Sequence, residues 1–334
     1  MGILFNVLWK KNKPVSRLGK ALKSGLNKPS GSVVVLYPDV DFDVVNLTNV
    51  IVVQPFFPTM LSWKNKGFSC EVLLPNRQYE LAVVCCTRSR EQTVDLIAQA
   101  AAQADCVVVD GQKVDGIESH YKMLKRLVKV EGNIIKGHGR LFWFLSEDLS
   151  HLRTEHKKFN QYTTVAGIFS AGSVDKGSEL LAAALPDTLT GNVADFGSGW
   201  GFLSIQILKR KSIISLDLIE ADANALEISK LNIKDARANF YWNDATSWNG
   251  SYDAVVMNPP FHSGRLGNPD LGRAFIINSA RNLRPKGYLW MVANRHLPYE
   301  KTLNQCFENV FPRQLLEYLQ SFLILTQVAC AIVR

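Results

Sequence analysis

The sequence has no apolar run that approaches the roughly 20 residues a helix needs to cross a lipid bilayer. Its six cysteines include no Cys-x-x-Cys pair, and the chain is far longer than a small secreted domain stapled by disulfides. We therefore expect reduced thiols and a cytoplasmic location. No cluster of metal-ligating side chains is visible, so no metal site is predicted.

Acidic residues are absent from the first 28 positions, which carry seven lysines and arginines. The net charge is +8, and the rest of the chain is nearly neutral, with 31 basic and 30 acidic residues. A local basic segment attracts phosphate groups, as in nucleic acids. An organelle-targeting segment and a solvated tail are the alternatives. We assign residues 1–30 to a basic N-terminal arm and leave these alternatives open.

The length of 334 residues fits two α/β domains. In the first, residues 31–150, apolar strands alternate with helical patterns, which predicts a parallel sheet covered by helices on both faces. The expected strands are 81–86, 106–109 and 141–145, and the expected helices are 90–103 and 117–129. The turn after the first of these strands, Thr87-Arg88-Ser89-Arg90, has no glycine, and no Asn-Pro-Pro follows. A glycine-free turn keeps a cofactor's charged groups from the backbone, so this half is predicted to be a scaffold without a cofactor site.

The stretch 146–161 is polar and is predicted to hold the domain boundary, with a linker at 151–165 and a second domain at 166–334. The second half repeats the alternation. Its expected strands are 193–196, 213–219, 239–242, 252–257 and 288–293, its expected helices are 202–209, 224–231, 272–283 and 299–307, and a closing antiparallel hairpin is expected at 315–318 and 322–332. Two α/β units in tandem suggest a duplication, although no sequence repeat is visible.

The first candidate ligand-binding feature of the second domain is a glycine-rich turn. Asp195 stands at the end of an expected strand, and Gly197, Gly199 and Gly201 permit a tight bend into a helix at Phe202. Such a turn exposes backbone N–H groups at a positive helix end, which suits the carboxylate of a methionine moiety. The spacing differs from the GxGxxG of dinucleotide-binding turns, and a purely structural turn is the alternative.

Acidic residues follow the next two strands. Glu220 lies roughly twenty residues after the glycines, where a carboxylate can accept hydrogen bonds from both hydroxyls of a ribose. Asp217 and Asp222 compete for this role. Asp244, after the third strand, is placed to accept from an adenine amino group, with a role in the turn as the alternative.

The segment Asn258-Pro259-Pro260-Phe261 follows an apolar strand and is the most specific signal. Two prolines fix φ and keep the chain extended. The Asn258 side-chain carbonyl and the Pro259 backbone carbonyl can then accept both hydrogens of one NH2 group, while Phe261 stacks on the planar group that carries it. Holding both hydrogens stabilises the positive charge that develops on the nitrogen during methyl transfer.

These residues resemble those of S-adenosylmethionine-dependent methyltransferases, and most closely the bacterial ribosomal RNA guanine-N2 methyltransferases (RsmC/RlmG type). The stretches that carry the resemblance are Phe169-Ser170, Val174 to Leu181, Asp195 to Gly201, Asn258 to His262, Val292 to Arg295 and Leu297 to Tyr299. The resemblance covers most of residues 160–334 and is weak in the first half, where it rests on His138-Gly139-Arg140-Leu141 and on architecture. Ser198 and Trp200 are variants within the glycine turn.

The resemblance implies an α/β fold of two tandem Rossmann-like methyltransferase domains. The first would be a degenerate copy that lacks a cofactor site and serves as scaffold and RNA-binding domain, and the second a seven-stranded, mostly parallel catalytic sheet. The cofactor would be S-adenosyl-L-methionine. Asp195, Gly197, Gly199 and Gly201 would contact its methionine part, Glu220 its ribose and Asp244 its adenine, while Asn258, Pro259 and Phe261 would hold the guanine. His262 has a precedent in the family, with a packing role as the alternative.

The predicted function is methyl transfer to the exocyclic N2 amine of a guanine in ribosomal RNA, with the small-subunit 16S rRNA as the first expectation. The base must be unpaired or flipped out of its helix. A large-subunit guanine, an adenine N6 amine and a protein glutamine are alternative substrates, because each presents a planar NH2. A non-catalytic ribosome-assembly or RNA-binding protein is the alternative of another class. The expected partner is ribosomal RNA or a ribosomal subunit, with no membrane.

Overall fold

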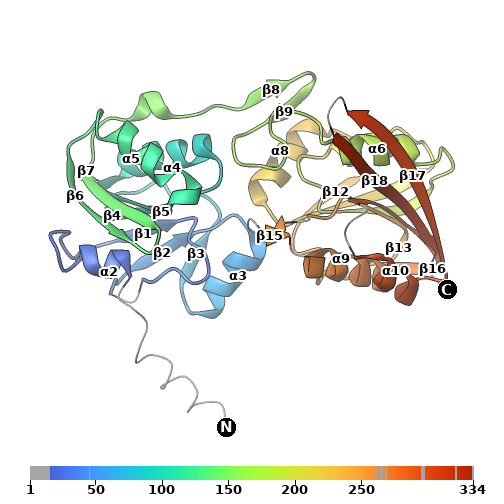
Figure 1. The fold of residues 1–334 in the computed structure, drawn as a ribbon, viewed down its shortest axis with the longest axis horizontal. Helices are drawn as coiled ribbons and strands as arrows, with labels where there is room; N and C mark the ends of the chain where they lie inside the picture. The colour runs from blue at the N-terminus through green and yellow to red at the C-terminus, as the bar shows by residue number, and fades with distance from the viewer. Residues whose placement is uncertain are drawn as a thin grey trace, which may run out of the picture. The chain divides into compact units, whose positions relative to one another are not determined.

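The structure, a computed structural model, describes residues 16–44, 46–260, 262–263, 266–267, 269–294, 298–319 and 322–332. The chain divides into two compact units (Figure 1). Unit 1 comprises Met1–Pro55 and Thr59–Glu155, and unit 2 comprises Phe56–Pro58 and His156–Arg334. None of the helices formed by the described residues has the length and apolarity that a membrane crossing requires.

Unit 1 is built on a seven-stranded sheet with the strand order β3-β2-β1-β4-β5-β7-β6. The strands are β1 (Val33–Leu36), β2 (Val50–Val53), β3 (Ser69–Glu71), β4 (Tyr79–Cys85), β5 (Ala104–Gln112), β6 (Val130–Lys136) and β7 (Gly139–Leu145). The helices are α2 (Arg17–Ala21), α3 (Phe57–Asn65), α4 (Arg90–Gln103) and α5 (Ile117–Leu124), with 3-10 turns η2 (Lys113–Asp115) and η3 (Ser150–Leu152). Strands β1 to β5 are parallel, whereas β7 is antiparallel to both β5 and β6.

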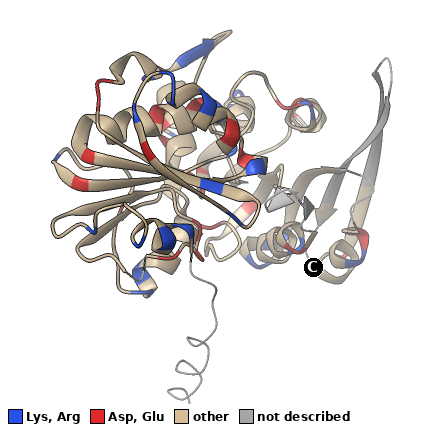
Figure 2. Ribbon diagram, turned by 60° about the vertical axis from the view of Figure 1, so that its left-hand side comes forward, with Lys and Arg blue, Asp and Glu red and all other residues tan. Residues whose placement is uncertain are grey.

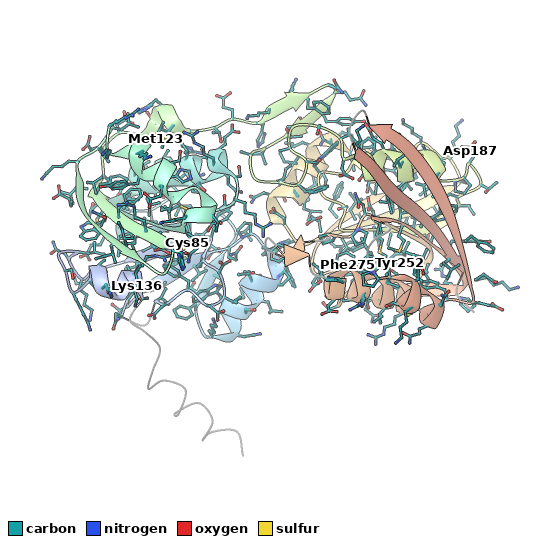
Figure 3. All side chains as sticks on the ribbon, viewed as in Figure 1. Cys85, Met123, Lys136, Asp187, Tyr252 and Phe275 are labelled. Atoms are coloured by element: carbon teal, nitrogen blue, oxygen red, sulfur yellow. The ribbon has the colours of Figure 1, made fainter. Side chains whose placement is uncertain are left out.

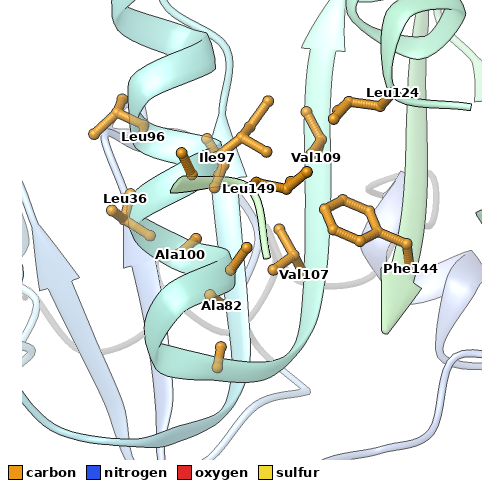
Figure 4. Close-up of a cluster of buried hydrophobic side chains, with 14 of the residues drawn as sticks. Leu36, Ala82, Leu96, Ile97, Ala100, Val107, Val109, Leu124, Phe144 and Leu149 are labelled. Carbon is orange, nitrogen blue, oxygen red and sulfur yellow. The ribbon is translucent and has the colours of Figure 1, made fainter. Parts of the chain in front are cut away.

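Helix α4 shows why the alternation of the sequence becomes this fold. The Ser89 hydroxyl caps its first turn by accepting from the Gln92 N–H at 3.2 Å. Leu96 and Ile97 on its inner face pack in one buried cluster with Val107 of β5 (Figure 4). Apolar side chains on the sheet therefore have a helical cover, as a parallel sheet requires.

Unit 2 holds a second seven-stranded sheet, with the order β12-β11-β10-β13-β16-β18-β17. Its strands are β10 (Gly191–Phe196), β11 (Ile213–Glu220), β12 (Ala238–Trp242), β13 (Tyr252–Met257), β16 (Leu283–Asn294), β17 (Asn309–Leu319) and β18 (Phe322–Ile332). Its helices are α6 (Lys176–Ala184), α7 (Phe202–Leu208), α8 (Ala223–Asn232), α9 (Pro269–Asn282) and α10 (Glu300–Cys306). Two small ribbons, β8 (Lys157–Phe159) with β9 (Tyr162–Thr164) and β14 (His262–Ser263) with β15 (Leu266–Gly267), complete it. The predicted closing hairpin is confirmed as the antiparallel pair β17 and β18.

The two sheets have the same topology. When the strands of each sheet are numbered in chain order, both read 3-2-1-4-5-7-6, so that β1 corresponds to β10, β2 to β11 and β4 to β13. Four parallel crossovers and a final antiparallel hairpin recur in the same places. This repetition supports the duplication that the alternation of strands and helices suggested.

The correspondence corrects one step of the sequence analysis. The strand predicted at 81–86 is β4, the fourth of unit 1, and not its first. Leu36 pairs with Val53 and Val84, just as Phe196 pairs with Ile219 and Met257. The counterpart of the glycine turn is therefore the segment after Leu36, where Tyr37 has a positive φ of 57°. The turn after β4 corresponds instead to the Asn-Pro-Pro segment.

The unit 1 positions that match the candidate site carry different side chains. By register, Tyr37 stands at the place of Gly197, Gln54 at that of Glu220 and Cys85 at that of Asn258. The Gln54 side chain is buried and donates to the Pro38 carbonyl at 3.0 Å. In unit 1 the first two strand ends are thus linked to each other through Gln54.

The folded part of unit 1 begins earlier than the predicted start at residue 31. Helix α2 lies within the segment assigned to the basic arm, and Leu18, Ala21 and Leu26 are buried in the core of unit 1. The Arg17 guanidinium binds both Asp110 carboxylate oxygens, at 2.6 and 2.8 Å. A bidentate, half-buried pair of this kind fixes the segment in place.

His120 of α5 is buried, and neither of its ring nitrogens has a hydrogen-bond partner within the described chain. Burial, and to a smaller extent the nearby Arg90 charge, lowers the pKa of His120 below its usual 6.5. Because the lowered pKa favours the neutral ring in the folded state, its stabilisation is present above pH 6.5 and is lost as the pH falls below it. We expect the free energy of unfolding to fall by at most about 1.4 kcal/mol per pH unit from this group. In urea unfolding between pH 5 and 8, His120→Leu should reduce the acid slope, and an unchanged slope would contradict this account.

Candidate active site

The register of the unit 2 sheet places three predicted site residues side by side. Phe196 of β10 pairs with Ile219 of β11 on one side and with Met257 of β13 on the other. The residues that follow these three positions are Gly197, Glu220 and Asn258. The glycine turn, the acid and the amide therefore meet at the carboxyl edge of adjacent parallel strands, where open α/β sheets bind their ligands.

The glycine turn has the conformation that its sequence predicts. Gly197, Gly199 and Gly201 have positive φ angles of 73°, 56° and 95°, and α7 begins directly afterwards at Phe202. A Cβ added to Gly201 would lie 2.8 Å from the end of the Ile233 side chain, so a larger residue there would force that side chain to move. A Cβ added to Gly199 would meet no atom of the described chain within 4 Å. The space above Gly199 is open.

The donors of this turn differ from the expectation that they face a ligand. The Gly197 N–H donates to the Ile219 carbonyl at 2.8 Å and the Gly199 N–H to Glu220 Oε2 at 2.7 Å. The Gly201 N–H donates to the Ser198 carbonyl at 3.0 Å. These three N–H groups brace the turn and the neighbouring strand. The first N–H groups of α7, which precede its first intrahelical bond, are the remaining backbone donors at this end of the turn.

Asp195 lies beneath the turn and is fully buried. Its Oδ2 accepts from the Ser204 hydroxyl at 2.6 Å, whereas Oδ1 has no partner among the described residues. Burial raises the pKa of Asp195 to about 7, against the opposing effect of the Ser204 hydrogen bonds. A buried carboxylate oxygen without a donor is costly, so this oxygen marks a place for a ligand donor.

Glu220 is held by two backbone N–H groups. Its Oε2 accepts from Gly199 and its Oε1 from Asp222 at 2.8 Å. Burial raises the pKa of Glu220 to about 7, and the same two hydrogen bonds offset this in part. Both carboxylate oxygens are fixed at the strand end and retain a lone pair each, which is what recognition of a diol requires.

The two competitors of Glu220 have other partners. Asp217 accepts from the Asn239 amide at 2.9 Å and from the Tyr252 hydroxyl at 2.8 Å. Tyr252 lies in the core of unit 2 (Figure 3). Asp222 caps α8 by accepting from the Asn224 N–H at 2.9 Å. These contacts explain why Asp217 lies within a strand. Glu220 is then the candidate for binding a ligand at the carboxyl edge of the sheet.

Asp244 follows β12, and the two hydrogen bonds that its side chain accepts from Thr246 fall on one oxygen. Its Oδ1 accepts from the Thr246 N–H at 2.8 Å and from the Thr246 hydroxyl at 2.7 Å. The structure thus gives Asp244 the turn role that was its alternative reading, and these two bonds leave Oδ2 as the oxygen that could accept from a ligand.

Asn258 is oriented by contacts that the sequence analysis missed. Its Nδ2 donates to Asp175 Oδ2 at 2.7 Å and to the Ser178 hydroxyl at 2.9 Å. Pro259 is buried and Pro260 is exposed. Phe261, predicted to stack on the acceptor, lies outside the described residues, and His262 is described only as part of β14.

A local signal for these contacts was present. Asp175, three residues before Ser178 and just ahead of an apolar run, is a helix-start signature, and Asp175 caps α6 by accepting from the Ser178 N–H at 2.9 Å. This segment contributed only to the family resemblance, and no helix was predicted at 176–184.

Residues 160–325 match the family described as "Methyltransferase small domain". This matched segment contains the glycine turn, Glu220 and Asn258. The matched segment, 166 of the 334 residues, belongs to the methyltransferase small domain family.

Curated relatives of this chain carry the name that the resemblance implies. A Psychromonas ingrahamii protein named Ribosomal RNA small subunit methyltransferase C is 39% identical over 153 residues, which are 45% of this chain and 44% of that protein. A Shewanella denitrificans protein of the same name is 38% identical over 148 residues, 43% of each chain. The chain therefore matches less than half the length of these relatives.

A solved structure supports the fold of both halves of this chain. The T. thermophilus 16S rRNA N2 methyltransferase (RsmC), in complex with AdoMet and guanosine, superposes with a TM-score of 0.75 over 92% of this chain and 89% of that one, at 21% sequence identity. The α/β fold with two domains and a mostly parallel seven-stranded sheet is confirmed.

Proposed function

We propose that this chain transfers the methyl group of S-adenosylmethionine to the exocyclic N2 amine of a guanine in ribosomal RNA, with the small-subunit 16S rRNA as its substrate. One observation carries the proposal: the register that sets Gly197 between Glu220 and Asn258. A cofactor turn and an acceptor for an amino group then share one edge. The names of the curated relatives support the substrate class.

The side chains present fit the cofactor. The open space above Gly199 admits a ligand against the backbone, and the unpaired Asp195 Oδ1 would accept from the ammonium group of the methionine part. Glu220 would accept from the ribose hydroxyls and Asp244 Oδ2 from the adenine amino group. When bound, S-adenosylmethionine supplies an electrophilic methyl group on a sulfonium.

Asn258 and Pro259 would hold the substrate amine. The two carbonyl oxygens, one from the Asn258 side chain and one from the Pro259 backbone, would accept both hydrogens of the NH2 group. This arrangement favours a pyramidal nitrogen and stabilises the positive charge that develops on it. Fixing the amine at the strand end adjacent to Gly197 supplies the alignment that a bimolecular reaction lacks in water. Phe261 would stack on the base.

Gly199→Ala tests the cofactor site with little cost to the fold. The added Cβ meets no described atom within 4 Å, and a φ of 56° costs an alanine about 1–2 kcal/mol. We expect the dissociation constant for S-adenosylmethionine to rise at least about tenfold, because the methyl group occupies the space assigned to the ligand. Isothermal titration calorimetry measures it.

Gly137→Ala is the matched control. Gly137 has a φ of 59°, and a Cβ there also meets nothing within 4 Å, but it lies in unit 1. It should lower the thermal midpoint as Gly199→Ala does while leaving cofactor affinity unchanged. Equal cofactor affinity in the two variants would contradict the site.

We propose that unit 1 is a degenerate copy that helps to fold the enzyme and to bind RNA, in a cytoplasmic protein. Its positions at the matching strand ends carry Tyr37 in place of Gly197, Gln54 in place of Glu220 and Cys85 in place of Asn258. Both signs of charge are distributed over the described part of unit 1 (Figure 2). The basic segment before Ser16 is the candidate for phosphate contact.

The test of the proposed function is methyl transfer to RNA. Wild-type protein and labelled S-adenosylmethionine are incubated in three separate reactions, with 16S rRNA, with 23S rRNA and with assembled small subunits. All three substrates come from cells that lack the protein. The expected result is saturable transfer to the small-subunit RNA. Transfer to 23S rRNA alone would move the substrate to the large subunit, and cofactor binding without transfer to any RNA would overturn the proposal.

A further inference from the structure

Helix α6 holds the amide group of Asn258. Asp175 and Ser178 precede Asn258 by 83 and 80 positions in the chain. Asn258 Nδ2 is nevertheless 2.7 Å from Asp175 Oδ2 and 2.9 Å from Ser178 Oγ. Both partners belong to the first turn of α6, and both stand outside the glycine turn and the Asn-Pro-Pro segment.

These contacts fix which way the amide faces. A carboxylate oxygen can only accept, so the NH2 side of Asn258, and not its carbonyl, must face Asp175. The second N–H of the same group points to the Ser178 hydroxyl oxygen. With both hydrogens directed to α6, the carbonyl oxygen is the part of the amide that remains for a ligand.

Asp175 and Ser178 are themselves fixed at the N-terminus of α6. Asp175 Oδ2 also accepts from the Ser178 N–H at 2.9 Å, so the N-cap of α6 fixes the same carboxylate oxygen that binds Asn258. Ser178 is 8% exposed. A Cβ added to Gly177 would lie 3.0 Å from that oxygen, so a residue larger than glycine at this position would crowd the carboxylate.

We propose that Asp175 and Ser178 are positioning residues that select the chemistry of the substrate, an inference that rests on the proposed function. They hold Asn258 so that the site presents an acceptor and no donor to the incoming base. An amino group with two hydrogens fits this site, and a carbonyl oxygen at the same place on a base is repelled by the Asn258 oxygen. Recognition of the guanine amine then depends on α6 as much as on the Asn-Pro-Pro segment.

A reciprocal exchange tests the contact. Asn258→Asp alone sets two carboxylates against each other and should lower kcat about 1,000-fold. Adding Asp175→Asn removes one of the two negative charges and supplies an amide N–H toward position 258, at the cost of the Ser178 N–H cap on that atom, and it leaves an acceptor toward the base. The double variant should recover at least about tenfold of the loss, which a purely structural role of Asp175 would not produce.

Two further variants separate positioning from helix capping. Asp175→Ala should lower kcat about 100-fold, with the dissociation constant of S-adenosylmethionine within about twofold of wild type. Asp175→Ser keeps a capping oxygen but withdraws the carboxylate from Asn258, so it should fold like wild type and lose kcat like Asp175→Ala. Ser89→Ala, which removes the cap of α4 in unit 1, should lower the thermal midpoint and leave kcat unchanged.

All variants are measured in single turnovers with ribosomal RNA from cells that lack the protein. Transfer by wild type without rescue in the exchange, or with Asp175→Ser as active as wild type, overturns this inference alone. Absence of transfer by folded, cofactor-binding wild type overturns the proposed function and this inference with it.

Discussion

Asn258→Ala is expected to lower kcat for methyl transfer about 1,000-fold while the dissociation constant of S-adenosylmethionine stays within about twofold of wild type. The reason is that the hydrogen bond from the amine to the Asn258 carbonyl becomes stronger as positive charge develops on the amine. Its loss therefore destabilises the transition state more than the bound substrate. The Asp175 and Ser178 contacts would keep this oxygen aligned before the substrate arrives, without reorganisation during the reaction. Single-turnover transfer with labelled cofactor gives kcat, and calorimetry gives the affinity.

The matched control for this substitution is Asn239→Ala. Asn239 is exposed in the same sheet, and its side-chain amide donates to Asp217 at 2.9 Å. It should retain kcat within about threefold, because its loss leaves an exposed site that water can satisfy. If the two alanine variants lose kcat equally, or if Asn258→Ala weakens the cofactor instead of slowing the reaction, the amide is not the acceptor.

Glu220→Ala is expected to weaken S-adenosylmethionine binding about 100-fold, because two hydrogen bonds from ribose hydroxyls to a carboxylate contribute about 1.5–3 kcal/mol each and part of that loss is recovered by water. The substitution also removes the acceptor of the Gly199 and Asp222 N–H groups. Asp217→Asn, in the same strand but engaged by Tyr252 and Asn239, should leave the affinity unchanged.

The pKa of about 7 at Glu220 gives this prediction a pH signature. A protonated carboxyl keeps fewer acceptor sites for a diol, so affinity should fall up to about tenfold per unit as the pH drops below 7. The Glu220→Gln variant should bind S-adenosylmethionine more weakly at every pH, and its affinity should lack this pH dependence. In the free protein the sign is opposite: a pKa raised by burial means stability that is present below pH 4.5 and is lost as the pH rises through 7. An affinity that rises on acidification would contradict the role of Glu220.

The position of the candidate site residues of unit 2 at one edge of the sheet could be predicted from the sequence, because the signals for it are local. A glycine turn, an acid at a strand end and an Asn-Pro-Pro segment each follow an apolar run, and parallel strands bring such ends to one edge. The contacts that orient these residues are not local. Asp175 and Ser178 reach Asn258 across 83 and 80 positions, and no spacing rule predicts a pair so distant in the chain.

Unit 1 was less predictable for a different reason. Strands β1 and β2 have four residues each and β3 has three, too few for a period to stand out, so the fourth strand was taken as the first. The predicted parallel direction of β7 was also wrong, since β7 is antiparallel to β5 and β6. Alternation of strands and helices favours parallel pairs and does not reveal a final hairpin. The proposal that this half lacks a cofactor turn therefore depends on Tyr37 and Gln54, and no longer on the turn at Thr87.

The most direct test of the account is the identity of the methylated nucleoside. Small-subunit RNA from cells lacking the protein is methylated in vitro with labelled S-adenosylmethionine, digested to nucleosides and separated by liquid chromatography with mass detection. The account predicts label in N2-methylguanosine, and its disappearance with Asn258→Ala. Label in N6-methyladenosine, or in protein glutamine of the assembled subunit, would contradict it.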